Sequence, residues 1–409
     1  MTALSYDSFD ECIQTLYPEL HEKARLTGLY ASEQWNSIVK TGSDWSRLPK
    51  QPLSLEEKLA VIAALPRNDR PQQSNKPVIV ILAGGKGTRM GDDIEQKSLC
   101  PICGTPALLR AVEMYRSFGI TDFVIVVGVG YQSVIESLQP CDLNISYLYQ
   151  EVQSGTGHAG RLASRYLKWL GYSGDVMVVM GDKYIARRGL ERMFLDHAES
   201  GADLTLSVAG KNAWPDSGRV VMNDEGRVCA ILEKPDIVLK RLLYDFRHWP
   251  QDPVSCRAFL ERAHKYWNRP DKLKKILGEE FWHRLHTMEA IPKSNAVISH
   301  CESDLRFQIT DSLHLLAEEV ETQCDWVNIS VYLFHSYALY DSMETLRPDN
   351  AQGEFYLTDA ALSLTSHHNE RIYKVVASRM PDDYDVMGFN TPEELARIEE
   401  HVRRTGLLD

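Results

Sequence analysis

The stretch 77-PVIVILAGGKGTRMG-91 joins a short apolar run to a cluster of glycines and cations. The apolar run is rich in β-branched residues, which is typical of a strand buried on both faces of a parallel sheet. Glycines directly after such a strand let backbone amides approach a ligand closely, and the lysine and arginine beside them favour an anion. The stretch therefore predicts a phosphate-binding loop where a central strand ends.

Apolar segments alternate with amphipathic segments from residue 76 onward. The apolar segments predict strands near 122–128, 145–150 and 175–182, and the segments between them have helical periodicity. This alternation predicts an α/β protein of Rossmann-like type with a mostly parallel mixed sheet. Ligands of such sheets bind at the carboxyl ends of the strands. The glycine loop and Asp182 both lie at such ends.

The chain divides into four segments that differ in composition and in the pattern of apolar residues. Residues 1–75 predict a helical extension and a linker, with a capping box beginning at Ser54. Residues 76–236 form the first part of the α/β core, and residues 326–409 form its second part. Residues 237–325 are rich in Trp, His, Arg and Lys and predict a helical insertion between them. Either the insertion or the N-terminal helices could support a homo-oligomer.

The amino-acid composition limits the kinds of partner that this protein can bind. The 409 residues are 44% hydrophobic and carry a formal net charge of −12, which argues against a nucleic-acid-binding surface. No apolar run is long enough for a membrane span, and the N-terminal residues lack the apolar region of a signal peptide. The eight cysteines are scattered, so we expect free thiols. A cytoplasmic protein that acts on phosphates, with neither nucleic acid nor membrane as partner, is the resulting expectation.

Two other motifs have competing interpretations. The sequence from Gly155 to Gly160 matches the dinucleotide fingerprint G-x-G-x-x-G, but it falls on the third strand–helix unit and not on the first. Cys100 and Cys103 have the spacing of a zinc half-site, but the chain offers no second close pair. We therefore do not interpret the glycines as a dinucleotide site, and we interpret the two cysteines as packing residues.

The stretch 82-LAGGKGTRMG-91, followed by Lys97, resembles the signature of the sugar-1-phosphate nucleotidyltransferases. Further matching motifs follow in the family's order: YQEVQSGTGHA (149–159), MGDKYI (180–185), SGRVV (217–221), ILEKPD (231–236), WVNISVYLF (326–334), AQGEFYLTD (351–359) and MGFNTPEEL (387–395). The series is most similar to the uridylyltransferase domain of bacterial N-acetylglucosamine-1-phosphate uridyltransferases. The family's acetyltransferase repeats have no counterpart here, so we expect neither acetylation nor trimers built by that domain.

The resemblance implies a nucleotide-diphospho-sugar transferase fold and an Mg²⁺-dependent reaction. A nucleotidyl group, uridylyl from UTP, would pass to a sugar 1-phosphate with release of pyrophosphate. The catalytic residues implied are Arg89, Lys97 and Asp182, and the metal ligands are Asp182 and Asn390. The implied nucleotide-binding residues are Leu82, Ala83, Gly84, Gly85, Gly87, Thr88, Gln150, Gly155 and Thr156. The implied sugar-phosphate-binding residues are Gly218, Glu233, Lys234, Asn328 and Thr358.

Departures from the family pattern leave the substrates open. Met180, Tyr184 and the pair Ile329-Ser330 replace residues that are usual near the acceptor. The acceptor could therefore be a sugar, a cyclitol or an amino-sugar phosphate, and the nucleotide could differ from UTP. A catalytically silent, regulatory sugar-nucleotide-binding protein is the alternative of another class. The retained set of catalytic and metal-binding side chains favours the enzyme, because a pure binder has little need of it.

Overall fold

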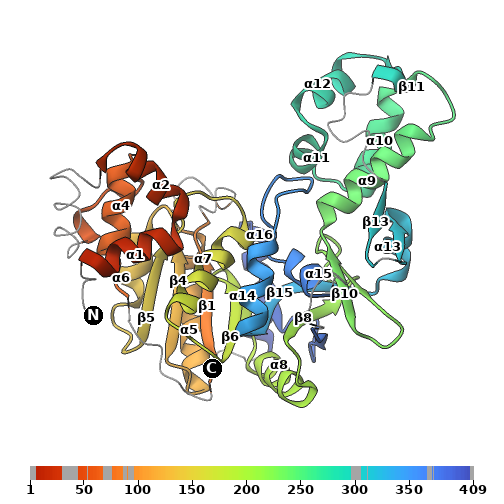
Figure 1. Cartoon of the computed structure of the whole chain (residues 1–409). Coiled ribbons are helices and arrows are strands. Elements are labelled where there is room, and N and C mark those ends of the chain that lie inside the picture. Colours follow the sequence, from red (N-terminus) through yellow and green to blue (C-terminus); the bar gives the residue numbers. More distant parts are fainter. Residues whose placement is uncertain are drawn as a thin grey trace.

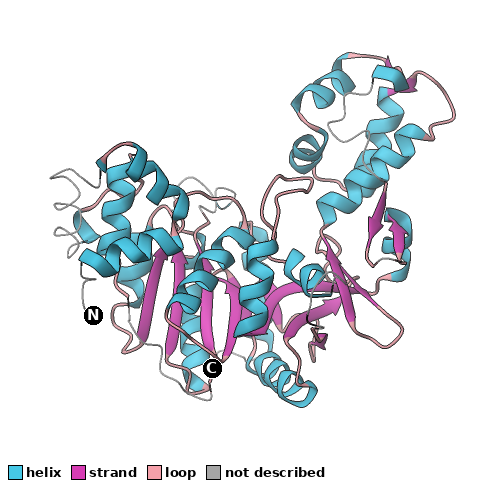
Figure 2. Ribbon diagram, in the orientation of Figure 1, coloured by secondary structure: helices cyan, strands magenta, loops and turns pink. Residues whose placement is uncertain are grey.

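A nine-stranded mixed sheet forms the centre of the computed structural model (Figures 1 and 2). The structure describes residues 6–29, 45–52, 54–67, 76–85, 90, 96–295, 305–310, 312–365, 371 and 373–405. The strands of the sheet are β1 (Val78–Ala83), β4 (Asp122–Val127), β5 (Asn144–Tyr149), β6 (Asp175–Met180), β8 (Leu204–Gly210), β9 (Arg219–Met222), β10 (Val228–Leu232), β15 (Trp326–His335) and β16 (Val375–Arg379).

The strand order confirms the predicted mixed α/β sheet. It runs β10-β9-β15-β6-β1-β4-β5, and β8 pairs with β15 and with β16. Strand β1 is parallel to β4 and β6, and β4 is parallel to β5. Strand β15 is antiparallel to β6, β8 and β9. All six residues of β1 are buried, as expected for a central strand with both faces covered.

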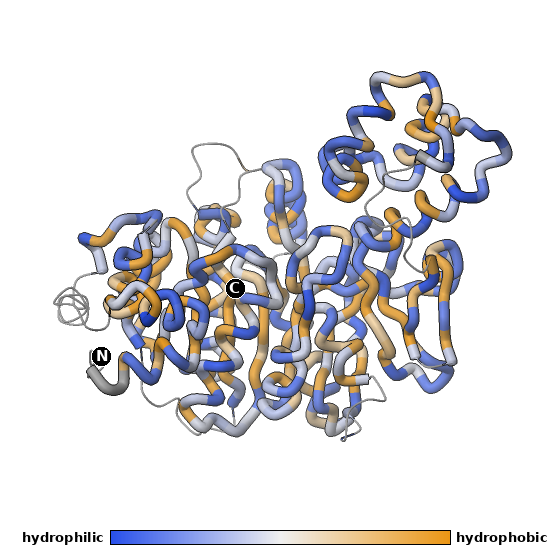
Figure 3. The backbone as a smooth tube through the Cα atoms, turned by 45° about the horizontal axis from the view of Figure 1, so that its top comes forward, coloured by the Kyte–Doolittle hydropathy of each residue, from blue (hydrophilic) through white to orange (hydrophobic). Residues whose placement is uncertain are grey.

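Helices cover both faces of the sheet. They are α5 (Ala107–Ser117), α6 (Tyr131–Leu138), α7 (Thr156–Trp169), α8 (Arg187–Ser200), α14 (Ser336–Thr345) and α15 (Asp359–Thr365). The strands between them are largely hydrophobic (Figure 3). Helix α16 (Pro392–Thr405) packs in a separate hydrophobic cluster with Tyr184 and Met387. Among the described helices, none is long and apolar enough to cross a membrane. The cysteines within the described ranges are all free, as predicted.

The N-terminal helices cover the edge of the sheet. Helices α1 (Tyr6–Leu16), α2 (Pro18–Leu26) and α4 (Leu55–Ala64) contribute apolar side chains to the same hydrophobic core as the strands. The predicted capping box at Ser54 is present and begins α4. On edge strand β5, the Tyr147 amide donates to the Pro66 carbonyl (2.9 Å) and the Tyr149 amide donates to the Tyr17 hydroxyl (3.1 Å). The extension therefore satisfies backbone groups that an open edge would leave exposed.

The insertion has a hydrophobic core of its own and projects from the sheet (Figure 1). Its helices are α9 (Lys234–Arg247), α10 (Cys256–Tyr266), α11 (Pro270–Leu277), α12 (Glu279–Thr287) and α13 (Ala317–Gln323). Phe246, Phe259 and Phe281 meet edge to face at its centre. Two short antiparallel strand pairs, β11 (Val254–Ser255) with β12 (Ala290–Ile291) and β13 (Arg306–Gln308) with β14 (His314–Leu316), interrupt the predicted helical pattern.

Candidate active site

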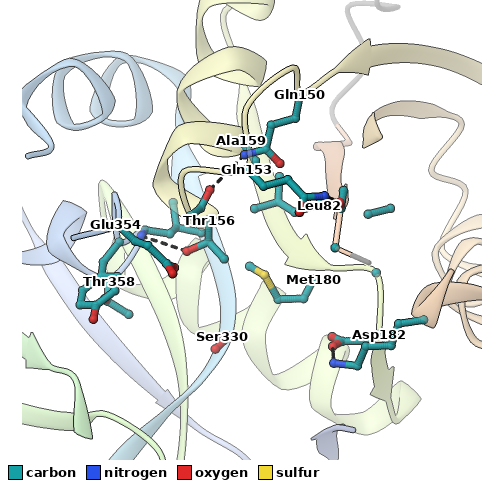
Figure 4. Close-up of a pocket in the computed structure, with 18 of the residues that line it drawn as sticks. Leu82, Gln150, Gln153, Thr156, Ala159, Met180, Asp182, Ser330, Glu354 and Thr358 are labelled. Atoms are coloured by element: carbon teal, nitrogen blue, oxygen red, sulfur yellow. Dashed lines mark hydrogen bonds and ion pairs between the residues drawn. The ribbon is translucent and has the colours of Figure 1, made fainter. Parts of the chain in front are cut away.

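A cavity of about 610 Å³ opens where β1, β5 and β6 end (Figure 4). Twelve residues predicted from the sequence line it: Leu82, Ala83, Gly84, Gly85, Lys97, Gln150, Gly155, Thr156, Asp182, Glu233, Thr358 and Asn390. The cavity thus brings together most of the residues expected to bind nucleotide, metal and acceptor. Gly87, Thr88 and Arg89 lie outside the described residues.

Three polar side chains from distant segments meet at one end of the cavity. Asp182 follows β6, and Asn390 follows β17 (Val386–Gly388), which pairs with β7 (Lys183–Ile185) directly after Asp182. Lys97 begins a short 3₁₀ helix, Lys97–Leu99. Its ammonium forms an ion pair with Asp182 and donates to the Asn390 Oδ1 at 2.9 Å. We refer to this end as the phosphate end.

The donor set at the phosphate end fits a magnesium ion that is completed by phosphates. Asp182 Oδ1 is buried and has no hydrogen-bond partner within the described ranges. Together with the Asn390 amide oxygen, it offers two hard oxygen ligands. Mg²⁺ commonly takes only one or two protein oxygens and completes its shell with phosphates and water. No cluster of three or more His, Cys, Asp or Glu that could hold a metal occurs among the described residues.

The opposite end of the cavity, which we call the base end, is built around the Gln150 side chain (Figure 4). Gln150 Nε2 donates to the Gly155 carbonyl (3.2 Å) and lies 3.3 Å from His158 Nδ1. Gln150 Oε1 lies against Gly84, where an added Cβ would stand 2.7 Å from it. A side chain at position 84 would therefore have to displace this amide. Gly155 also has a φ of +102°, a conformation that favours glycine.

A segment from the second part of the core closes over the base end. The Gly157 amide donates to the Phe355 carbonyl (2.7 Å), and the Phe355 amide donates to the Ser154 carbonyl (2.8 Å). The Leu357 amide donates to the Thr156 hydroxyl (3.2 Å). These bonds fix the loop that carries Gln352, Glu354, Tyr356 and Leu357, which all line the cavity.

A further side of the cavity, which we call the acceptor wall, contains acidic residues. Burial and the neighbouring Asp236 raise the pKa of Glu233 to about 7. Burial, Asp236 and Glu233 raise the pKa of Asp359, directly after the lining residue Thr358, to about 7. Gly218 lies behind this wall, and a Cβ there would stand 3.3 Å from Glu233 Oε1. Its lack of a side chain therefore leaves room for the Glu233 carboxyl.

Three predicted acceptor residues, Gly218, Lys234 and Asn328, do not line the cavity. The Lys234 ammonium pairs with Glu321 (2.7 Å), which also binds the buried Arg219 (2.9 Å). Lys234 is therefore held by a structural ion-pair cluster. The Asn328 side chain donates to the Tyr332 hydroxyl (2.7 Å) and accepts from the Ser330 amide (3.1 Å). It supports the wall from behind.

Several lining residues were missed by the sequence interpretation. They are Ser98, Gln153, Ala159, Gly181, Tyr332, Gln352, Glu354, Tyr356 and Leu357. Met180 and Ser330, which also line the cavity, were noted in the sequence only as departures near the acceptor. Ser330 had a signal: it replaces the family's usual glycine, and it adopts a φ of 64° where β15 shifts register against β8. Gln153, Gln352 and Glu354 lie inside matched motifs, so their motif positions were the available signal.

Comparisons with known proteins show which proteins this chain is similar to. Residues 79–354 match a family model described as the MobA-like NTP transferase domain. The bifunctional protein GlmU of Geobacter sulfurreducens is 27% identical over 326 residues, which cover 80% of this chain and 50% of that protein. GlmU of Exiguobacterium sibiricum is 36% identical over 165 residues, covering 40% of this chain and 35% of that protein. The chain thus spans at most about half the length of these curated relatives.

A solved structure shows the same fold. It is a putative glucose-1-phosphate thymidylyltransferase from Bacillus anthracis in complex with sucrose. The likeness has a TM-score of 0.50 at 16% sequence identity and covers 80% of this chain and 96% of that one. At this identity the likeness bears on the fold alone. It agrees with the predicted Rossmann-like nucleotide-diphospho-sugar transferase fold.

Proposed function

Because this chain belongs to the family of MobA-like NTP transferase domains, a nucleotidyltransferase family, we propose that it transfers uridylyl from UTP to a sugar 1-phosphate. The observation that carries the proposal is the meeting of Lys97, Asp182 and Asn390 at the phosphate end of a cavity that also holds Gln150 and Glu233. One space therefore offers groups for a triphosphate, a base and an acceptor.

The reaction assigns a task to each end of the cavity. An oxygen of the acceptor phosphate attacks the α-phosphorus of the triphosphate in line, and pyrophosphate leaves. The Lys97 ammonium is close enough to the phosphate end to stabilise the charge that develops there. Arg89, which lies outside the described residues, remains our candidate for holding pyrophosphate. Asp182 and Asn390 would hold Mg²⁺, which neutralises phosphate charge when it is bound.

The acceptor is proposed to lie along the acceptor wall. Glu233 and Thr358 line that wall and can exchange hydrogen bonds with hydroxyl groups. Because Lys234 pairs with Glu321, the acceptor phosphate would depend on Lys97 and the metal for its charge partner. A cyclitol or amino-sugar phosphate presents similar hydroxyl groups and is the second acceptor class to test.

The proposal is tested with a matrix of substrates. Purified protein is mixed with Mg²⁺, each of four nucleoside triphosphates and a panel of sugar, amino-sugar and cyclitol phosphates, and pyrophosphate release is measured. We expect release with UTP and a sugar 1-phosphate, and loss of that release in Lys97→Gln. Binding of a sugar nucleotide without pyrophosphate release from any pair would indicate the regulatory alternative and overturn the enzyme.

A further inference from the structure

The base end contains a histidine whose position bears on nucleotide choice. His158 lies in the first turn of α7, and its Nδ1 lies 3.3 Å from Gln150 Nε2. Its ring is next to the Phe355 ring, with centroids 6.2 Å apart. Gln150 itself is 6% exposed, so its amide has little contact with bulk water. A buried amide takes its orientation from its hydrogen-bond partners.

Those partners fix which atom of the amide faces the protein. The Gly155 carbonyl can only accept, so the nitrogen of the Gln150 amide must point toward it. His158 also makes a hydrogen bond to the backbone of Val152 that favours a proton on the ring, as a bond to a carbonyl does. Because an amide nitrogen can only donate, the hydrogen bond between Gln150 Nε2 and His158 Nδ1 requires a lone pair on Nδ1, so the neutral ring carries its proton on Nε2. This lone pair accepts the second N–H of Gln150.

The oxygen of the amide is consequently left for the ligand. Gln150 Oε1 faces Gly84, at the start of the phosphate-binding loop. An oxygen here attracts the N3–H of uracil and repels the N3 lone pair of cytosine. An amide free to flip would accommodate either base, because its nitrogen could donate to cytosine. The discrimination therefore depends on what holds the amide.

We propose that His158 is a positioning residue that locks the Gln150 amide with its oxygen toward the base and so selects UTP over CTP. This inference rests on the proposed function of the same cavity. His158 contacts no reacting atom in this proposal. It acts through Gln150 alone.

Protonation of His158 would reverse its role. With a proton on Nδ1, the ring would donate toward the Gln150 nitrogen and no longer accept from it. Burial lowers the pKa of His158, so the neutral ring prevails near neutral pH. The charged groups that face the ring are Glu151, Arg161 and Glu19; the two carboxylates raise this pKa and the guanidinium lowers it.

The test compares two variants that differ in one property. His158→Asn places an amide oxygen near the position of Nδ1 and can still accept, whereas His158→Phe keeps the ring shape and cannot. The ratio of kcat/KM for UTP to that for CTP is measured with the preferred acceptor. We expect the ratio to fall by about tenfold in His158→Phe and to stay near the wild-type value in His158→Asn. An unchanged ratio in His158→Phe would overturn the proposal.

A second measurement uses the wild-type protein and needs no folded Phe variant. The same ratio is followed as the pH is lowered, because titration of the triphosphate is common to UTP and CTP and cancels. We expect the ratio to fall in the wild type and to remain flat in His158→Asn; parallel profiles would contradict the role of His158. If no pyrophosphate is released at all, the proposed function fails, and the ratio of dissociation constants for UTP and CTP then tests the amide lock separately.

Discussion

Lys97 Nζ lies 2.9 Å from Asn390 Oδ1, although 293 positions separate the two residues in the chain. The same ammonium pairs with Asp182, so one positive charge stands between the two oxygen groups that we propose as metal ligands. A metal ion at this place would repel the ammonium toward the phosphates. Metal binding and the placement of Lys97 are therefore expected to be coupled.

The first prediction concerns these oxygen groups. Asp182→Asn and Asn390→Ala should each lower kcat at saturating Mg²⁺ by at least ~10²-fold, because charge stabilisation at the reacting phosphates is lost. Pyrophosphate release is the measurement. Asp175→Asn, at the other end of β6, is the control and should retain turnover. Near-normal turnover in both site variants would refute the metal assignment.

The second prediction concerns the insertion. Lys275 of α11 donates to Glu354 (2.8 Å) and to Gln352 (3.3 Å), both of which line the cavity. Because these two residues lie on the loop that closes over the base end, Lys275→Ala should raise the KM for the triphosphate about two- to fivefold and change the KM for the acceptor less. Lys274→Ala is the matched control, because Lys274 pairs with Glu279 inside the insertion. Equal changes for both substrates would mean that the insertion only supports the fold.

The third prediction is a pH dependence of stability. The pKa values of Glu233 and Asp359 are raised to about 7, so the folded chain binds protons that the unfolded chain has already released. The free energy of unfolding should therefore fall as the pH rises from about 4.5 to about 7 and level off above it. Urea unfolding at several pH values measures this slope.

Two variants identify which carboxyl group causes this dependence of stability on pH. Glu233→Gln should reduce the slope of the unfolding free energy against pH by the amount that corresponds to about one bound proton. Glu344→Gln should not reduce it, because Arg165 lowers the pKa of Glu344. A slope that is unchanged in Glu233→Gln would contradict the raised pKa.

The fourth prediction concerns the N-terminal extension that packs on edge strand β5. Tyr17→Phe removes the hydroxyl that accepts from the Tyr149 amide and leaves a buried N–H unpaired, at a cost of about 1–3 kcal/mol in the free energy of unfolding. Tyr115→Phe is the control, because the Tyr115 hydroxyl is buried and has no hydrogen-bond partner among the described residues. It should lose less stability. Equal losses in denaturant titrations would argue against the edge bond.

The sequence was informative where function depends on backbone position. The apolar run before Gly84 predicted a buried central strand, and the strand ends predicted that Gln150 and Asp182 would line the same cavity. The direction of the side chains was harder to predict from the sequence, because it depends on partners that are distant in the chain. Lys234 points to Glu321, 87 positions away, and no local pattern indicates that pair. The packing of the N-terminal helices on β5 was missed for the same reason.

The central place of β15 has a consequence for how the chain is made. Within the described residues, β15 is the strand that joins β6 to β8 and β9, yet it is encoded after the whole insertion. On the ribosome, β6 therefore emerges with an open hydrogen-bonding edge and keeps it until the insertion has been synthesised. Such nascent edges invite wrong partners. The insertion's own hydrophobic core would allow it to fold in the meantime, which would shorten the distance that β15 must search to close the sheet.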